Sequence, residues 1–181
     1  MELSSQQSLA VSQTEAWAAL NDIELLQRCI PGCESITPTG ENQYEVLVTA
    51  AVGPVKAKFK GKLKLENLQP PNSYTLQFEG QGGAAGHAKG SADVSLKPMA
   101  ERETLLEYRA KAQVGGRIAQ IGSRLVDMAA QKMAGEFFSA FGEQLALRFP
   151  SASKDLATAV APSSWWSRVW SALRRLFGAS A

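Results

Sequence analysis

Residues that could carry out chemistry are few in this sequence of 181 residues. The two cysteines, Cys29 and Cys33, have no histidine nearby in the sequence, so they do not make the ligand set of a zinc site, and we expect reduced thiols. So few cysteines also exclude a disulfide framework and favour a reducing, cytoplasmic compartment. The only histidine, His87, falls in an alternating segment, on the side that carries the polar residues. We therefore expect no metal site.

The side of each alternating segment that should face the interior contains no Asp, Glu or Lys. Neither a carboxylate pair nor a nucleophile–base couple is therefore predicted. The glycine-rich run at 80–90 lacks the strand–loop–helix context of a phosphate-binding loop, and we interpret it as a loop and part of the inner face. We expect that the protein is not an enzyme, although an error of one residue in register would exchange the two faces.

Three tyrosines are the polar side chains that do face inward: Tyr44, Tyr74 and Tyr108. Their hydroxyl groups could hydrogen-bond a ligand carbonyl, or each tyrosine could be a core residue with one partner inside the protein. The same face is rich in small residues, which are Ala50, Ala57, Gly61, Gly86, Ala88, Gly90, Ala92, Ala110 and Ala112. Large side chains normally fill the layer between a sheet and a helix. The small residues therefore indicate either a helix that lies close to the sheet or an apolar cavity for a ligand.

The segment 55–66, VKAKFKGKLKLE, sets the architecture that must position these residues. Apolar or small residues alternate in it with five lysines and a glutamate, which is the period of a β-strand with one buried and one solvated face. Because the connections are mostly short, we expect its neighbours to be antiparallel. The further strands are predicted at 2–9, 33–37, 43–52, 73–80, 87–97 and 103–114.

Helices complete the predicted fold. Ser12 and Glu15 form a capping-box pattern that should begin a short helix, and a second short helix should cover 23–28. Residues 117–148 contain no proline and repeat apolar residues at steps of three and four, which predicts one long helix across the inner face. The fold class is therefore α+β, a curved antiparallel sheet of about seven strands wrapped on a long C-terminal helix. The predicted cavity wall comprises Tyr44, Val46, Val48, Ala57, Phe59, Gly61, Leu63, Tyr74, Leu76, Phe78, Ala92, Val94, Tyr108, Ala110, Ala112, Ile118, Ile121, Leu125, Met128, Phe137 and Phe141.

The C-terminal segment has a different composition. Residues 150–162 are small and polar enough to form a flexible linker. Residues 163–181 contain three of the four tryptophans, three arginines and no acid, with the apolar and basic residues largely on opposite sides of a predicted helix. Such a helix is typical of a membrane interface, while docking on the protein's own domain or on a partner is the alternative. The predicted membrane-binding residues are Trp165, Trp166, Arg168, Val169, Trp170, Leu173, Arg174, Arg175, Leu176 and Phe177.

The charge distribution agrees with this division. The net charge is +2, and the segment from residue 151 onward contains four basic residues and one acidic residue, so the body is nearly neutral and is not expected to bind nucleic acid. The N-terminus has no basic region followed by an apolar run, so we expect no secretory signal. We predict a domain at 1–149, a linker at 150–162 and a tail helix at 163–181. The protein should be cytoplasmic and peripherally attached to the inner face of the cell membrane.

Three spaced motifs resemble one family. They are CIPGCE at 29–34, GPVKAKFKG at 53–61 and GGRIA at 115–119. In order and context they are similar to the CoxG family of carbon monoxide dehydrogenase subunits, within the START/Bet v 1-like helix-grip (SRPBCC) superfamily, over roughly residues 1–148. The resemblance implies a helix-grip fold that holds a hydrophobic ligand. It also implies a quinone, such as menaquinone or ubiquinone, and a partner that is a carbon monoxide dehydrogenase or another respiratory oxidoreductase.

These expectations combine into one function with alternatives. The protein would carry a quinone, with no covalently bound cofactor, between an anionic lipid surface and the partner enzyme. It could instead recruit or assemble that enzyme without a ligand, or be a Bet v 1-like cyclase or dehydratase, which would require an inward acid or base. Whether the outer face of 55–66 is a docking surface is left open; its lysines are Lys56, Lys58, Lys60, Lys62 and Lys64.

Overall fold

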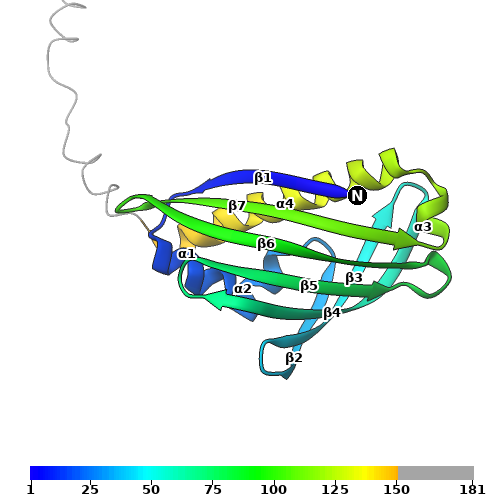
Figure 1. The fold of residues 1–181 in the computed structure, drawn as a ribbon, viewed down its shortest axis with the longest axis horizontal. Coiled ribbons are helices and arrows are strands. Elements are labelled where there is room, and N and C mark those ends of the chain that lie inside the picture. Colours follow the sequence, from blue (N-terminus) through cyan, green and yellow to red (C-terminus); the bar gives the residue numbers. More distant parts are fainter. Residues whose placement is uncertain (151–181) are drawn as a thin grey trace, which may run out of the picture. The chain divides into compact units, whose positions relative to one another are not determined.

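The lysine-rich segment forms β4 (Val55–Gln69), a long strand inside a seven-stranded antiparallel sheet (Figure 1). The computed structural model describes residues 1–150, so the predicted tail helix, its membrane-binding residues and all of the predicted linker except Pro150 lie outside the described residues. The strand order is β1-β7-β6-β5-β4-β3-β2, and every neighbouring pair is antiparallel. The other strands are β1 (Glu2–Leu9), β2 (Cys33–Gly40), β3 (Gln43–Val52), β5 (Ser73–Gln81), β6 (His87–Ala100) and β7 (Glu103–Gly115). The predicted fold class is confirmed.

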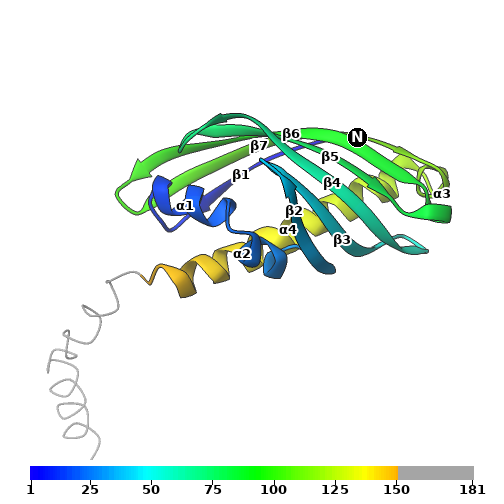
Figure 2. The same ribbon diagram turned by 90° about the horizontal axis from the view of Figure 1, so that it is seen from below.

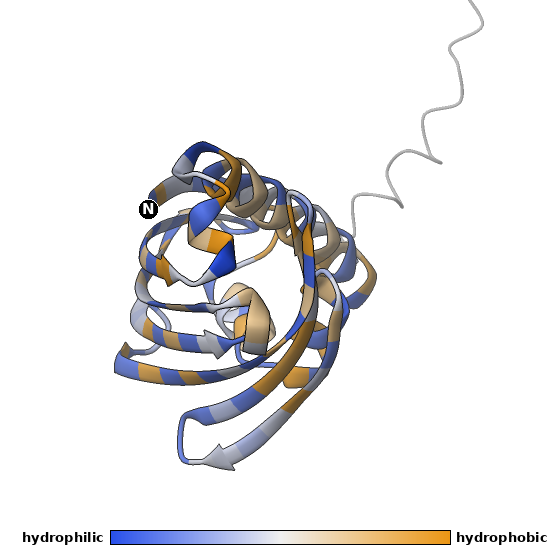
Figure 3. Cartoon of the chain, turned by 90° about the vertical axis from the view of Figure 1, so that its right-hand side faces the viewer, coloured by the Kyte–Doolittle hydropathy of each residue, from blue (hydrophilic) through white to orange (hydrophobic). Residues whose placement is uncertain are grey.

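Alternation along the strands separates two faces of this sheet. In β4 the lysines are exposed, whereas the intervening residues from Val55 to Leu65 are half-buried. Figure 3 shows the corresponding bands of opposite hydropathy along the strands. Because side chains of a strand point alternately to the two faces, the apolar set of each strand lies on the inner side.

Two short helices and a C-terminal helix lie on that inner side (Figure 2). The helix α1 (Gln13–Leu20) begins with the predicted capping box, in which the Ser12 backbone N–H donates to Glu15 Oε2 at 2.8 Å and the Glu15 N–H donates to Ser12 Oγ at 3.3 Å. The helix α2 (Ile23–Cys29) is capped by Asp22, whose Oδ1 accepts from the Leu25 N–H at 3.0 Å. A single 3-10 turn, η1 (Gly83–Ala85), connects β5 to β6.

The C-terminal helix is not continuous, which corrects the prediction of one helix over 117–148. The structure has a short α3 (Arg117–Gln120) and a long α4 (Ser123–Arg148), separated at Gly122, whose φ of +97° is incompatible with a right-handed helix. The break changes which residues of the N-terminal half of α4 face the sheet. Leu125 and Met128, which we expected on the inner face, are 43% and 57% exposed, while Val126 is buried.

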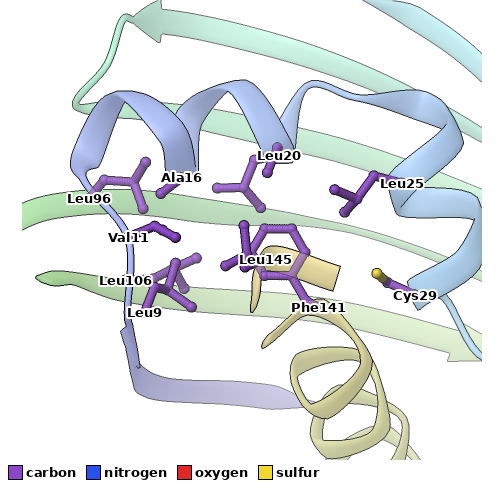
Figure 4. Packing of buried hydrophobic residues seen from close by; sticks show 11 residues of the cluster. Leu9, Val11, Ala16, Leu20, Leu25, Cys29, Leu96, Leu106, Phe141 and Leu145 are labelled. Carbon is purple, nitrogen blue, oxygen red and sulfur yellow. The ribbon is translucent and has the colours of Figure 1, made fainter. Parts of the chain in front are cut away.

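The closely packed core lies at one end of the inner face, around α1, α2 and the C-terminal half of α4 (Figure 4). Arg148, near the end of α4, forms an ion pair with Asp22 at the start of α2. The buried Thr104 donates its hydroxyl to the backbone carbonyl of Val11 at 2.9 Å. The cluster comprises Leu9, Val11, Ala16, Ala19, Leu20, Leu25, Cys29, Leu96, Leu106, Phe141 and Leu145.

Candidate functional site

A cavity of about 300 Å³ lies next to this core, between the inner face of the sheet and the helices α1, α2 and α4. Apart from Asn21 and three tyrosines, the side chains that line it are apolar. Its volume is at the lower end of the range of about 300–1,000 Å³ that is usual for small-molecule pockets. The lining residues are Leu20, Asn21, Ile23, Leu26, Ile30, Ile36, Tyr44, Leu63, Leu65, Tyr74, Leu76, Ala92, Val94, Leu106, Tyr108, Phe137 and Phe138.

The strand register builds the floor of this cavity from two rows of side chains across the sheet. In one row Leu65 of β4 pairs with Leu76 of β5, which pairs with Ala92 of β6. In the other row Tyr74 pairs with Val94, and Val94 pairs with Tyr108. Ala92 carries only a methyl group in the middle of its row, so the space above it is left open.

Aromatic rings surround one part of the cavity. The Trp17 and Tyr74 rings meet edge to face with their centroids 5.7 Å apart. Tyr108 stacks on Phe138 at 5.3 Å, and Phe137 meets Phe138 edge to face at 5.0 Å. Planar faces and edges in these arrangements provide favourable contacts for a further aromatic ring.

The tyrosines differ in how their hydroxyl groups are engaged. Burial raises the pKa of Tyr108, and a hydrogen bond with Ser5, its cross-strand partner, acts in the opposite direction. Burial alone raises the pKa of Tyr74 to about 12. Both phenols are therefore neutral hydrogen-bonding groups at physiological pH, and neither is a base.

Eight of the predicted wall residues line the cavity: Tyr44, Leu63, Tyr74, Leu76, Ala92, Val94, Tyr108 and Phe137. Their binding of a ligand stays a prediction. The other predicted residues are not among those that line it. Val46, Ala112, Ile118 and Phe141 are buried; Val48, Ala57, Phe59, Gly61, Phe78, Ala110 and Ile121 are half-buried; Leu125 and Met128 are exposed.

Away from the cavity, phenylalanine rings of neighbouring strands cover some of the small residues. A Cβ atom at Gly90 would lie 2.9 Å from the ring of Phe78, its cross-strand partner, and one at Gly82 would overlap the ring of Phe59. Here the small residues accommodate large neighbours and leave no space. Of the two explanations for the small residues, close packing therefore holds at Gly90 and an open space holds at Ala92.

Nine lining residues were not predicted: Leu20, Asn21, Ile23, Leu26, Ile30, Ile36, Leu65, Leu106 and Phe138. Most come from α1, α2 and the segment into β2. The spacing of Ile23, Leu26 and Ile30 at steps of three and four gives α2 an apolar side, and this signal was available in the sequence. Residues 29–34 do not reveal from sequence alone that Ile30 faces the same space.

Neither cysteine nor histidine lies in the wall of this cavity. Cys29 is buried and Cys33 half-buried, both are free thiols, and burial raises the pKa of each. His87 is exposed at the start of β6. Within residues 1–150, no group of three His, Cys, Asp or Glu side chains is arranged to hold a metal ion.

The lysines of β4 are largely neutralised by acids on the same face. Such exposed pairs contribute about 0–1 kcal/mol each to stability, so their main effect is on the surface potential. The pairs are Lys58–Glu34 at 2.7 Å, Lys60–Glu45 at 3.3 Å, Lys62–Glu79 at 3.8 Å and Lys64–Glu66 at 2.7 Å. This face is therefore less positive than the sequence pattern indicates.

Solved structures with similar folds include several START-like proteins. A conserved protein from Geobacillus kaustophilus is 29% identical with a TM-score of 0.77, and the match covers 81% of this chain and 95% of that one. A START superfamily protein from Mycobacterium smegmatis is 14% identical (TM-score 0.62, 80% and 96% covered). The Zhui aromatase/cyclase from Streptomyces sp. R1128 is 11% identical (TM-score 0.60, 84% and 97% covered).

The last two likenesses concern the fold alone, which is the START/Bet v 1-like helix-grip fold. No curated protein sequence matches this chain. Among the described residues, no helix is both long and apolar enough to cross a membrane. The family and the fold together indicate a protein that binds a hydrophobic ligand. Because the family model of the carbon monoxide dehydrogenase CoxG subunit matches residues 6–146, the chain belongs to the CoxG family.

Proposed function

We propose that the protein is a carrier that binds a quinone of the menaquinone or ubiquinone type and exchanges it between a membrane and a soluble oxidoreductase. The observation that carries this proposal is the apolar cavity of about 300 Å³, whose wall contains no Asp, Glu, His, Lys or Arg among the described residues. A neutral ring with an apolar chain can enter such a cavity without loss of a charged group's hydration.

The size of the cavity limits how much of the ligand it holds. A ring head the size of a large aromatic side chain would bury about 150–250 Å², which is worth about 4–6 kcal/mol at about 25 cal/mol per Å². The cost of association is of the same order or larger, so the first part of the isoprenoid chain must add to the burial. We propose that the ring and the start of the chain occupy the cavity and that a long chain extends beyond it. Such modest affinity suits a carrier that must release its ligand.

Solvent extraction of the purified protein, followed by mass spectrometry, tests ligand binding. The matched control is Ala92→Phe, which places a ring in the open space above β6. The wild-type extract should contain a quinone in stoichiometric amounts, and the extract of the variant should lack it. Repeated blank extracts from the wild-type protein, combined with no binding of added quinone, would reject the carrier and leave membrane recruitment without a ligand as the alternative.

The membrane part of the proposal concerns residues 163–181, which lie outside the described residues. We propose that they attach the protein peripherally to the inner face of the cell membrane through their tryptophans and arginines. Vesicle flotation of the full chain and of a chain that ends at residue 162 should show binding only with the tail. Replacement of Arg168, Arg174 and Arg175 by Gln should weaken binding to anionic vesicles about 100-fold, at about 1 kcal/mol for each charge, and should leave binding to neutral vesicles unchanged.

The partner that we propose follows from the family, because CoxG is described as a subunit of carbon monoxide dehydrogenase. The ligand-loaded protein should pass its quinone to such an enzyme or to a related respiratory oxidoreductase. A quinone-reduction assay with the purified dehydrogenase tests this step. Reduction should depend on the loaded protein, and it should fall to the level of free quinone with the Ala92→Phe variant.

A further inference from the structure

Tyr74 is the polar side chain of the cavity wall whose surroundings differ most from those of a packed core tyrosine. It lies on the inner face of β5, its ring contacts Trp17, and its cross-strand neighbour is Val94. The phenol is deep in the protein, and burial is the cause of its raised pKa of about 12. A hydroxyl group in such a place normally has a hydrogen-bond partner, because a buried unpaired hydroxyl is costly.

The Tyr74 hydroxyl has no hydrogen-bond partner within residues 1–150. In the same part of the chain, no fully enclosed side-chain oxygen or nitrogen is left without a partner. The Tyr74 hydroxyl is therefore not sealed within packed atoms, and the open space beside it is the cavity that this residue lines. Tyr108 provides the contrast, because its hydroxyl already hydrogen-bonds Ser5 across the β1–β7 pair.

We infer that the Tyr74 hydroxyl donates a hydrogen bond to a neutral acceptor, a carbonyl oxygen, on the ring of the bound ligand and so orients that ring in the aromatic part of the cavity. This inference rests on the proposed function and adds to it the position and chemistry of the polar contact. The ring faces of Tyr108, Phe137 and Phe138 lie in the same part of the wall. A planar ring with a carbonyl in its plane satisfies both features.

The charge of the wall restricts the ligand further. Asn21 is the other polar group of the lining besides the tyrosines, and its amide already donates to the Trp17 carbonyl at 2.8 Å. Because no lining residue is cationic, a carboxylate or phosphate placed here would lose its hydration without an ion pair. The site therefore selects uncharged carbonyl compounds over fatty acids and phospholipids of similar apolar area.

The experiment compares two ligands that share one ring shape. Menadione (2-methyl-1,4-naphthoquinone) has two carbonyl oxygens, and 2-methylnaphthalene has none. Equilibrium dialysis against the full chain should show that Tyr74→Phe weakens menadione about threefold to tenfold, which is the range of one neutral hydrogen bond, and leaves 2-methylnaphthalene unchanged. The control, Tyr108→Phe, should not discriminate between the two ligands, because that hydroxyl is already paired with Ser5.

An infrared measurement separates orientation by Tyr74 from a purely structural role. The carbonyl stretch of bound menadione should lie at lower frequency in the wild type than in Tyr74→Phe. Equal weakening of both ligands, or an unchanged carbonyl stretch, would overturn the role of Tyr74 while leaving the carrier intact. Failure of the wild-type protein to bind either ligand would instead reject the proposed function. Binding of 2-naphthoate as tight as that of menadione would contradict the selection against anions.

Discussion

Ala92→Leu tests whether the space above the centre of the sheet is open or is filled in solution. The change adds three carbon atoms, which are worth about 0.8 kcal/mol each when they are buried in an existing apolar cavity. The rotamer entropy lost by the leucine costs about 0.5–1 kcal/mol, so the free energy of unfolding should rise by about 1.5 kcal/mol. For a chain of this length, that corresponds to an increase in Tm of about 3–6 °C. Quinone binding should weaken at the same time, because the leucine occupies ligand volume.

A matched change in the packed core should have the opposite effect on stability. Ala19 in α1 is 0% exposed and lies inside the hydrophobic cluster. Ala19→Leu has no cavity to enter, so overpacking should lower the free energy of unfolding by about 1–3 kcal/mol. Urea denaturation of the ligand-free full-length proteins, with the slope m compared between variants, measures both changes. If Ala92→Leu is destabilised as much as Ala19→Leu, the helices close on the sheet at this position and the reasoning about the cavity is wrong.

Further predictions concern the elements that hold the cavity in place. Thr104→Val removes the donor to the Val11 carbonyl and should lower the free energy of unfolding by about 1–3 kcal/mol in urea denaturation, while Thr104→Ser should lower it less. The hydrogen bond from the Ser12 backbone N–H holds the pKa of Glu15 below its usual 4.5, so its stabilising contribution is present above that pH and is lost as the pH falls through the lowered value. Glu15→Gln should therefore flatten the acid limb of a stability–pH profile; an unchanged limb would assign it to other groups. Gly32→Ala should lower Tm, because φ is +70° and the added Cβ would overlap the Thr49 carbonyl; an unchanged Tm would contradict that geometry.

Much of the fold could be predicted because the sequence states it locally. The alternation in β4, the capping box before α1 and the short turns each depend on residues close together in the chain. Burial then follows, because an alternating strand has only one face that can join a core. The lysines illustrate the limit of this reasoning. Their exposure could be predicted from alternation, but their pairing with acids such as Glu34 and Glu79 depends on strands far apart in sequence.

The candidate site was less predictable, for two physical reasons. The continuous apolar repeat through 117–148 gives no sign that Gly122 adopts a positive φ and turns Leu125 and Met128 outward. A small residue in a strand is also ambiguous by itself. Gly90 lies under the Phe78 ring, whereas Ala92 lies under open space, and the difference depends on which large side chains are cross-strand neighbours.

The arrangement of core and cavity explains how one small domain can be stable and still contain an open space. The packed cluster of α1, α2 and the end of α4 is anchored at its edges by the Thr104 hydrogen bond and the Arg148–Asp22 pair. The cavity lies beside this cluster, and its floor is formed by strands whose hydrogen bonds fix the backbone whatever side chain they carry. Substitutions above the floor, at Ala92 or Leu76, should therefore change ligand size and affinity more than stability. A CoxG domain could in this way change its ligand without losing its fold.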